Sequence, residues 1–350
     1  MNIELSRNNL IEKISELLKN ARNKVASTVN QTMVLTYFEI GRMIVEEEQS
    51  GKERADYGKQ LIVDISDKLT NNFGRGFSIT NIQQMRNFYL IYQKQQTPSA
   101  NFVKTNSETL SRNLIQDNFN LSWSHYLKLM RIEDENERKF YEIESYKNNW
   151  SLRELQRQYD SALYTRLALS RNKDKVLELS TKGQNLEHPQ DVVKDPYVLE
   201  FLGLKEFSEY SENDLEQSLI DKLENFLLEL GNGFTFVARQ KRITFEEKHF
   251  RIDLVFYNRI LKCFVLIDLK IGELKHQDIG QMQMYVHYYD REMKLQDENK
   301  TIGIILCQDK NEAVVRYTLP ENNEQIFASK YLTVLPSKEA LKQLLENKND

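Results

Sequence analysis

The sequence predicts an all-α N-terminal domain followed by an α/β domain with the element order α-β-β-β-α-β. Three observations carry this prediction. Apolar residues within 1–180 recur every three or four positions, as they do on amphipathic helices. Beyond residue 212, short runs rich in β-branched and aromatic residues alternate with helical segments. Between the two parts, glycines and prolines interrupt a segment without regular spacing. We therefore expect a helical domain over 1–180, a linker over 181–212 and a mixed-sheet domain over 213–350.

The helical half divides at glycine-rich and polar segments. One apolar stripe comprises Leu10, Ile14, Leu17 and Leu18, and a second comprises Leu61, Ile65 and Leu69. The segment 71–78, NNFGRGFS, separates two helices, and the polar stretch 96–113 predicts a long loop. Ser151 and Glu154 have the spacing of a capping box, which predicts a helix from 152 to the high 160s.

The α/β half shows its elements in sequence order. We expect a helix over 214–230 that ends at Gly231, strands over 234–239, 250–257 and 261–269, a helix over 277–290, a strand over 301–307, and helices over 311–317 and 337–346. Residues 258–260 would form the hairpin turn between the second and third strands. This order describes a small mixed sheet flanked by helices.

The composition is that of a globular protein, with 40% hydrophobic and 29% charged residues. No apolar run approaches the roughly 20 residues that span a bilayer, and the first residues carry charges where a signal peptide is apolar. We therefore expect a cytoplasmic protein without membrane contact. Cys263 and Cys307 lie in apolar runs, which favours buried free thiols.

The strand FVLIDLK (264–270) ends in an acid and a lysine. Side chains alternate along a strand, so Asp268 and Lys270 point to the same face. Asp253 lies on the preceding strand of the expected hairpin, where it can face Asp268. Two facing carboxylates repel each other, and a divalent cation such as Mg²⁺ compensates them. The alternative is a structural ion pair of Lys270 with either acid at a sheet edge.

Several segments carry a resemblance to a known family. RIDLVFYNRILKCFVLIDLK (251–270) resembles the PD-(D/E)xK nuclease superfamily, whose restriction-endonuclease-like fold has the α-β-β-β-α-β core. YFEIGRMIVEEEQSGKERADYGKQLI (37–62), LSWSHYLKLMRI (121–132) and LENFLLELGNGFTFVARQ (223–240) are similar to the YhcG-type branch, in which a helical domain precedes the nuclease domain. The resemblance covers nearly the whole chain. It implies a metal-dependent nuclease.

The resemblance assigns roles to three residues of the motif and suggests one helical glutamate outside it. Asp253 and Asp268 match the two metal-binding acids, although this family more often has Glu at the second. Lys270 matches the motif lysine, and Ile252 stands where the motif's name has proline. A helical glutamate often adds a metal ligand, and Glu216 is the candidate; the alternative is an acid that favours the first turn of its helix.

The helix that follows the motif adds a further candidate pair. Gln281 and Tyr285 lie four positions apart, on one helical face. They are similar to the Q-x-x-x-Y element of one superfamily branch, which implies contact with the substrate near the cut. Gln283 is an alternative to Gln281. An ordinary amphipathic helix with Met282 and Val286 in the core would show the same pattern.

The N-terminal half contains one candidate DNA-binding helix. Ser78 is a natural N-cap, and the residues that could contact a DNA backbone or groove are Arg75, Asn81, Gln84 and Arg86. The alternative is a packing helix with Ile82, Met85, Phe88 and Tyr89 toward a core.

The expected function is Mg²⁺-dependent hydrolysis of DNA, with Mn²⁺ able to substitute. The helical domain would bind DNA, a partner from a restriction or defence system, or a second copy of the chain. An alternative is a catalytically weak, nuclease-like DNA-binding or assembly module in such a system. An RNA-directed enzyme is a third reading, but no aromatic RNA-binding signature supports it.

Overall fold

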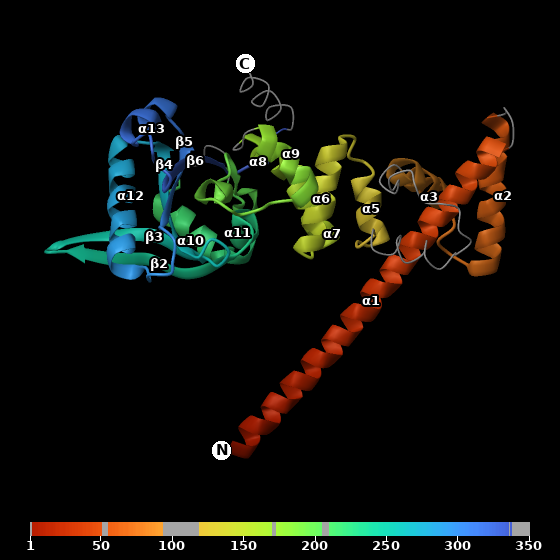
Figure 1. Cartoon of the computed structure of the whole chain (residues 1–350), viewed down its shortest axis with the longest axis horizontal. Coiled ribbons are helices and arrows are strands. Elements are labelled where there is room, and N and C mark those ends of the chain that lie inside the picture. The colour runs from red at the N-terminus through yellow and green to blue at the C-terminus, as the bar shows by residue number, and fades with distance from the viewer. Residues whose placement is uncertain are drawn as a thin grey trace. The chain divides into compact units, whose positions relative to one another are not determined.

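The structure is a computed structural model that describes residues 2–50, 55–93, 119–169, 173–204, 210–335 and 337. The chain forms two compact units (Figure 1). The first comprises Met1–Arg138 and Ser145–Leu152, and the second Lys139–Glu144 and Arg153–Asp350. The whole of the expected 96–113 loop, and all of the expected 337–346 helix except Ser337, lie outside the described residues. The domain limits expected from the sequence stay a prediction.

The first unit is helical, as expected. Its helices are α1 (Asn2–Ser50), α2 (Ala55–Phe73), α3 (Ile79–Tyr92), α5 (Trp123–Leu129) and the two ends of α6 (Glu135–Lys147). Gly41 lets α1 approach α3 closely, because a Cβ there would collide with the Met85 carbonyl oxygen. The stripe expected at the start of α1 does not face this core: Ile14, Leu17 and Leu18 are exposed.

The second unit joins short helices to a sheet. Its elements are α7 (Leu152–Asp160), α8 (Leu163–Leu169), α9 (Lys173–Lys182), the 3-10 turns Pro189–Val192 and Glu200–Leu202, β1 (Tyr197–Val198), α10 (Glu212–Asp221), α11 (Leu223–Leu230), β2 (Phe234–Phe245), β3 (Lys248–Asn258), β4 (Cys263–Glu273), α12 (His276–Tyr288), a π-helical turn at Tyr289–Met293, β5 (Ile302–Asp309), α13 (Glu312–Thr318) and β6 (Ile326–Leu332).

The sheet confirms the expected core and enlarges it. Its strand order is β1-β6-β5-β4-β3-β2, with β2, β3 and β4 antiparallel in turn and the remaining pairs parallel. The expected 214–230 helix is wrong in one respect, because Lys222 interrupts it between α10 and α11. β1 and β6 were not expected, and β2 and β3 extend into a longer hairpin than the sequence predicted.

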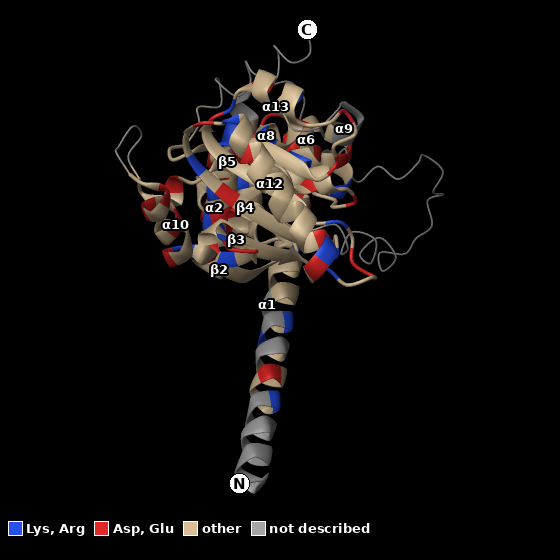
Figure 2. Ribbon diagram, turned by 90° about the vertical axis from the view of Figure 1, so that its left-hand side faces the viewer, with Lys and Arg blue, Asp and Glu red and all other residues tan. Residues whose placement is uncertain are grey.

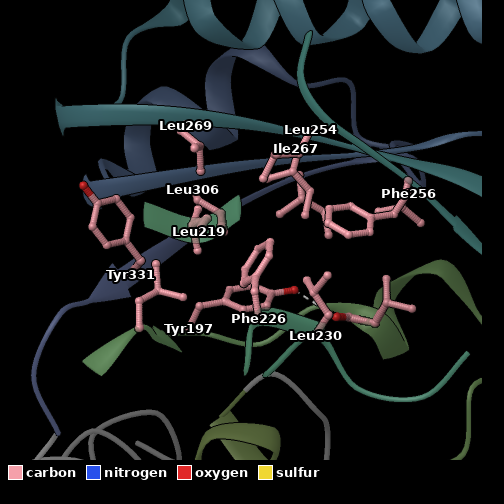
Figure 3. Packing of buried hydrophobic residues seen from close by; sticks show 14 of the residues in the cluster. Tyr197, Leu219, Phe226, Leu230, Leu254, Phe256, Ile267, Leu269, Leu306 and Tyr331 are labelled. Atoms are coloured by element: carbon pink, nitrogen blue, oxygen red, sulfur yellow. Dashed lines mark hydrogen bonds between the residues drawn. The ribbon is translucent and has the colours of Figure 1, made fainter. Parts of the chain in front are cut away.

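Apolar side chains cover both faces of the sheet. On one face, Ile267 and Leu269 pack with Leu219 of α10 and Phe226 of α11 (Figure 3). On the other face, Leu266 and its neighbours pack against α12. Each strand of the hairpin core therefore alternates between two buried layers, which fixes its register. Cys263 and Cys307 are buried free thiols, as expected.

A buried ion network joins the short helices to this sheet within the second unit. The Arg166 guanidinium of α8 lies 2.6 Å from the Glu229 carboxylate of α11, and both side chains are fully buried. Lys194 donates to the Glu229 carbonyl oxygen, and the Val198 amide donates to the Glu229 carboxylate at 3.0 Å. Burial alone would raise the pKa of Glu229, but the Arg166 and Lys194 charges hold it well below its usual value.

In the described part of the chain, no helix is both long enough and apolar enough to cross a membrane.

Candidate functional site

The candidate site lies where β3 and β4 separate. Their ladder runs from Asn258 paired with Cys263 to Leu254 paired with Ile267, so Asp253 and Asp268 are the next residues at this end. The expected antiparallel pairing of these strands is therefore confirmed. Asp253 Oδ2 accepts a hydrogen bond from the Leu269 amide at 2.8 Å. A side chain thus replaces the ladder's next backbone bond, and both acids lie at the opening between the strands.

The Asp268 carboxyl group is buried, which disfavours its charged form. Its side chain is 2% exposed and lies near enough to Asp253 for the two carboxyl groups to repel each other. Burial, together with the Asp253 charge, raises the pKa of Asp268 to about 7, and Lys270 only partly opposes the shift. The two carboxyl groups therefore hold negative charge that the folded protein compensates incompletely, which suits a cation.

Lys270 supplies the nearest positive charge. Its Nζ lies 2.9 Å from Asp268 Oδ2 and 3.9 Å from Glu212 Oε2. Burial alone would lower the pKa of Lys270, but the Asp268 charge and hydrogen bond raise it above its ordinary value. The side chain is therefore an ammonium at neutral pH. Just beyond it the β4–β5 register shifts, and Gly272 adopts a positive φ of 89°, a bulge of the kind found beside active sites.

Gln240 is a component that the sequence did not reveal. Its amide nitrogen donates to Asp253 Oδ1 at 3.1 Å and also to Glu216 Oε2. The residue has a positive φ of 47°, which is rare for a side chain of this kind and directs it between the two acids. A single glutamine on a polar strand carries no recognisable signal, so only the structure could identify it.

Glu216, the expected helical ligand, lies on α10 beside this cluster. Its carboxylate accepts from Gln240, and Arg239 Nε lies 3.3 Å from Oε1. Burial raises the pKa of Glu216, with a further increase from Asp253. The Gln240 amide therefore connects Glu216 to the acid pair, and no contact joins Glu216 to Asp268.

The donor set fits a hard divalent cation in part. Among the residues that the structure describes, no group of three or more His, Cys, Asp and Glu side chains is arranged to hold a metal ion. One or two carboxylates, completed by water and a substrate phosphate, are however the usual donors for Mg²⁺. Asp253 and Asp268 provide such a pair, and a cation bound between them would relieve the repulsion of their carboxylates.

Gln281 and Tyr285 contact each other, as their spacing predicts. The Gln281 amide donates to the Tyr285 hydroxyl, which in turn donates to the Arg251 carbonyl oxygen at 2.8 Å. Tyr285 is fully buried, so this position gives no support to the prediction that it contacts DNA. Its hydroxyl instead ties α12 to β3, two residues before Asp253. No described contact joins Gln281 to the acid pair.

The expected DNA-binding residues of the first unit have mixed surroundings. Ser78 caps α3, as predicted. Arg86 Nε lies 2.7 Å from Glu48, and Asn81 bonds with Gly76 and with the Trp123 indole, so both side chains already have protein partners. Arg75 is exposed and Gln84 is half-buried. Ile82, Met85 and Phe88 are buried, as in the packing alternative.

Two family profiles match this chain in succession. The DUF1016 N-terminal domain matches residues 13–166, and the YhcG PDDEXK nuclease domain matches residues 190–346. A relative from Escherichia coli (strain K12), named "Putative nuclease YhcG", is 40% identical over 344 residues. The alignment covers 94% of this chain and 90% of that protein.

Solved structures show only a partial likeness. A crystal structure of a repair endonuclease from Pyrococcus abyssi is 20% identical with a TM-score of 0.26, covering 36% of this chain and 49% of that one. An EndoMS–double-stranded DNA complex is 16% identical with a TM-score of 0.27, covering 39% and 51%. The chain thus matches about half the length of each. The two family profiles and the full-length relative place it: this chain belongs to the YhcG family, with a DUF1016 N-terminal domain and a C-terminal PDDEXK nuclease domain.

Proposed function

We propose that this protein is a Mg²⁺-dependent deoxyribonuclease of the cytoplasm that hydrolyses phosphodiester bonds at the opening between β3 and β4. The observation that carries the proposal is that Asp253 and Asp268 follow the last β3–β4 pair at the same end of the ladder, with the Lys270 ammonium 2.9 Å from Asp268. A structural ion pair of Lys270 with Asp268 would not need Asp253, a half-buried second acid whose charge opposes the first.

Asp253 and Asp268 would hold the metal. A bound Mg²⁺ supplies Lewis-acid stabilisation of the phosphate oxygens and lowers the pKa of a coordinated water. Mn²⁺ has the same preference for oxygen donors and should substitute. Loss of the Asp268 proton, whose pKa burial and the Asp253 charge raise to about 7, frees its carboxylate for this role.

The surrounding residues orient the acids and supply positive charge. Lys270 keeps its proton and faces the place where negative charge grows on the phosphate, so it acts as an electrostatic stabiliser and not as a base. Gln240 and the Leu269 amide fix the Asp253 carboxylate from two directions. Tyr285, aligned by Gln281, fixes the β3 backbone just before Asp253.

The DNA-binding role of the helical unit is also part of the proposal. Arg75 and Gln84 have no described side-chain partner and are the residues of the α3 region that could contact DNA. The exposed stripe at Ile14, Leu17 and Leu18 on α1 is where a second copy or a restriction or defence partner would bind. The competing function is a DNA-binding or assembly module that does not cleave DNA.

Alanine at position 270 is expected to lower the cleavage rate by about 10²–10³-fold, the usual effect of removing one group that stabilises transition-state charge. The assay follows Mg²⁺-dependent cleavage of supercoiled, linear and branched DNA by the full chain. Lys310→Ala is the matched control, since Lys310 is a half-buried lysine that pairs with acids away from the site.

Two outcomes would contradict the proposal. One is a wild-type protein that cuts none of these DNAs in Mg²⁺ or Mn²⁺, which would leave the assembly module as the better account. The other is a Lys270→Ala protein that cuts as fast as Lys310→Ala.

A further inference from the structure

The hairpin formed by β2 and β3 continues beyond the rest of the sheet. β3 pairs with β4 only as far as Leu254, whereas it pairs with β2 down to Lys248. The part of the hairpin past Asp253 therefore has no neighbouring strand on the β4 side, and it projects beyond the sheet in Figure 1. An exposed strand edge can pair with another chain, so a projecting hairpin normally has features that hold it in place and prevent such pairing.

One face of this projecting part is held by α12. Ile243, Phe250 and Ile252 belong to the same apolar cluster as the α12 side chains, and the Phe245 ring lies 5.5 Å from the Tyr288 ring. This packing explains why the hairpin is ordered. It also fixes which residues point the other way, because side chains alternate along each strand.

The opposite face carries two arginines directly across from each other. Arg242 and Arg251 are cross-strand partners, and both are exposed. Neither guanidinium has an ion pair or hydrogen bond in the described part of the chain. Like charges in directly opposed positions destabilise a ladder. The next pair on this face, Thr244 and His249, is hydrogen-bonded at 3.0 Å and adds no acid.

These arginines lie close to the candidate site. Arg251 precedes Asp253 by two residues, which is about 7 Å along a strand and comparable to the spacing of neighbouring phosphates on DNA. Arg242 follows Gln240 by two residues, and Gln240 points toward α10, away from α12. The Arg251 backbone is also anchored through its carbonyl oxygen by Tyr285. The pair is thus held at a fixed distance from the acids.

We propose that Arg242 and Arg251 form a phosphate-binding pair, which holds the DNA backbone one or two phosphates from the bond that is cut. The inference rests on the proposed deoxyribonuclease function and names how the substrate is held. Two guanidinium groups can grip a phosphate through paired, charge-assisted hydrogen bonds, and the anion removes their mutual repulsion. Contacts of this type read the backbone and not the bases, so binding through them is independent of sequence.

Figure 2 shows blue and red ribbon around the labels of β2, β3 and β4. Residues 240–251 contain four Lys and Arg and two Glu, although the C-terminal half as a whole is acidic. The basic residues are therefore concentrated where DNA would leave the acidic site. A hairpin that served only as the edge of the sheet would not need four basic residues between positions 240 and 251.

The test measures binding of a fluorescein-labelled duplex and its single strand to the full chain, in Ca²⁺ and again in EDTA, over a range of salt concentrations. Arg242→Gln with Arg251→Gln is expected to weaken binding at least about tenfold and to reduce the slope of log K against log salt by about one to two. Arg259→Gln with Arg291→Gln removes the same charge from exposed positions of the same unit and should change neither quantity.

Cleavage separates the failure of this inference from the failure of the proposed function. The double variant at positions 242 and 251 should cut DNA with a raised KM and a nearly unchanged kcat. If the wild type binds and cuts but this variant equals it in affinity and salt slope, the phosphate-binding pair is wrong and the nuclease proposal stands. If the wild type neither binds nor cuts either DNA, both are wrong.

Discussion

Asparagine at position 268 is expected to abolish measurable DNA cleavage and to stabilise the metal-free protein at pH 8. Cleavage should fall at least about 10²-fold, because the pair loses one of its two metal-binding carboxylates and with it much of the Lewis-acid stabilisation. Stability should rise because the buried Asp268 carboxylate is unfavourable when charged, and the amide has the same shape without the charge. Opposite changes in activity and stability are typical of catalytic residues.

The gain in stability should depend on pH in a defined direction. The pKa of Asp268 is raised to about 7 in the folded protein, against about 4 when unfolded. Between these values the folded state binds more protons, so the stability of the wild type falls as pH rises. The Tm of Asp268→Asn minus that of the wild type should grow from about pH 4 to about pH 7 and then level off.

The comparison needs thermal melts in EDTA beside cleavage assays in Mg²⁺. Asp309→Asn is the matched control, since Asp309 lies at the exposed end of β5 on the same sheet. If Asp268→Asn melts well below the wild type at pH 8, the lost cleavage reflects misfolding and the account of a strained catalytic carboxylate is wrong.

Glutamine at position 229 is expected to lower the free energy of unfolding of the second unit by about 3–5 kcal/mol, as breaking one side of a buried ion pair does. The amide keeps the shape of the side chain but leaves the fully buried Arg166 without its counter-charge. Lys194 would also lose the charge that opposes the effect of burial, which already lowers its pKa to about 8. Urea unfolding followed by circular dichroism measures the change.

Glu224→Gln is the control for this prediction, because Glu224 is an exposed residue of the same helix, α11. A difference of less than about 1 kcal/mol between the two variants would mean that the network contributes no more than a surface ion pair. A large difference would show that charge binds α8 to α11, although the N-terminal family profile extends to residue 166 and so into α8.

The fold was predictable where the apolar residues follow a single spacing, either that of a strand or that of a helix. The strand FVLIDLK and its hairpin partner follow from apolar runs around a turn, and that pairing alone brings Asp253 next to Asp268. The hairpin beyond Asp253 was missed because its outer face is polar and exposed, so that 240–249 lacks an apolar run. The break at Lys222 was missed since the apolar stripe continues through it from α10 to α11.

The candidate site was predictable only where a motif specifies it. Asp268 and Lys270 share a face because side chains alternate along β4. The pairing of β3 with β4 then brings Asp253 to the same end of the ladder. Gln240 reaches the acids through an unusual backbone conformation that the surrounding sequence does not predict. Arg86 is engaged by Glu48, 38 residues earlier in the chain, and such tertiary partners have no local signature. The same applies to Tyr285, whose hydroxyl binds a backbone carbonyl on β3.

The location of a bound metal tests the central claim most directly. Crystals of the full chain soaked in Mn²⁺ and measured at the manganese edge should show an anomalous peak between the carboxylates of Asp253 and Asp268, with ligand distances near 2.1–2.2 Å, close to those for Mg²⁺. The peak should disappear in Asp268→Asn crystals soaked in the same way. A strong peak bound elsewhere, or none between these two residues in the wild type, would contradict the account.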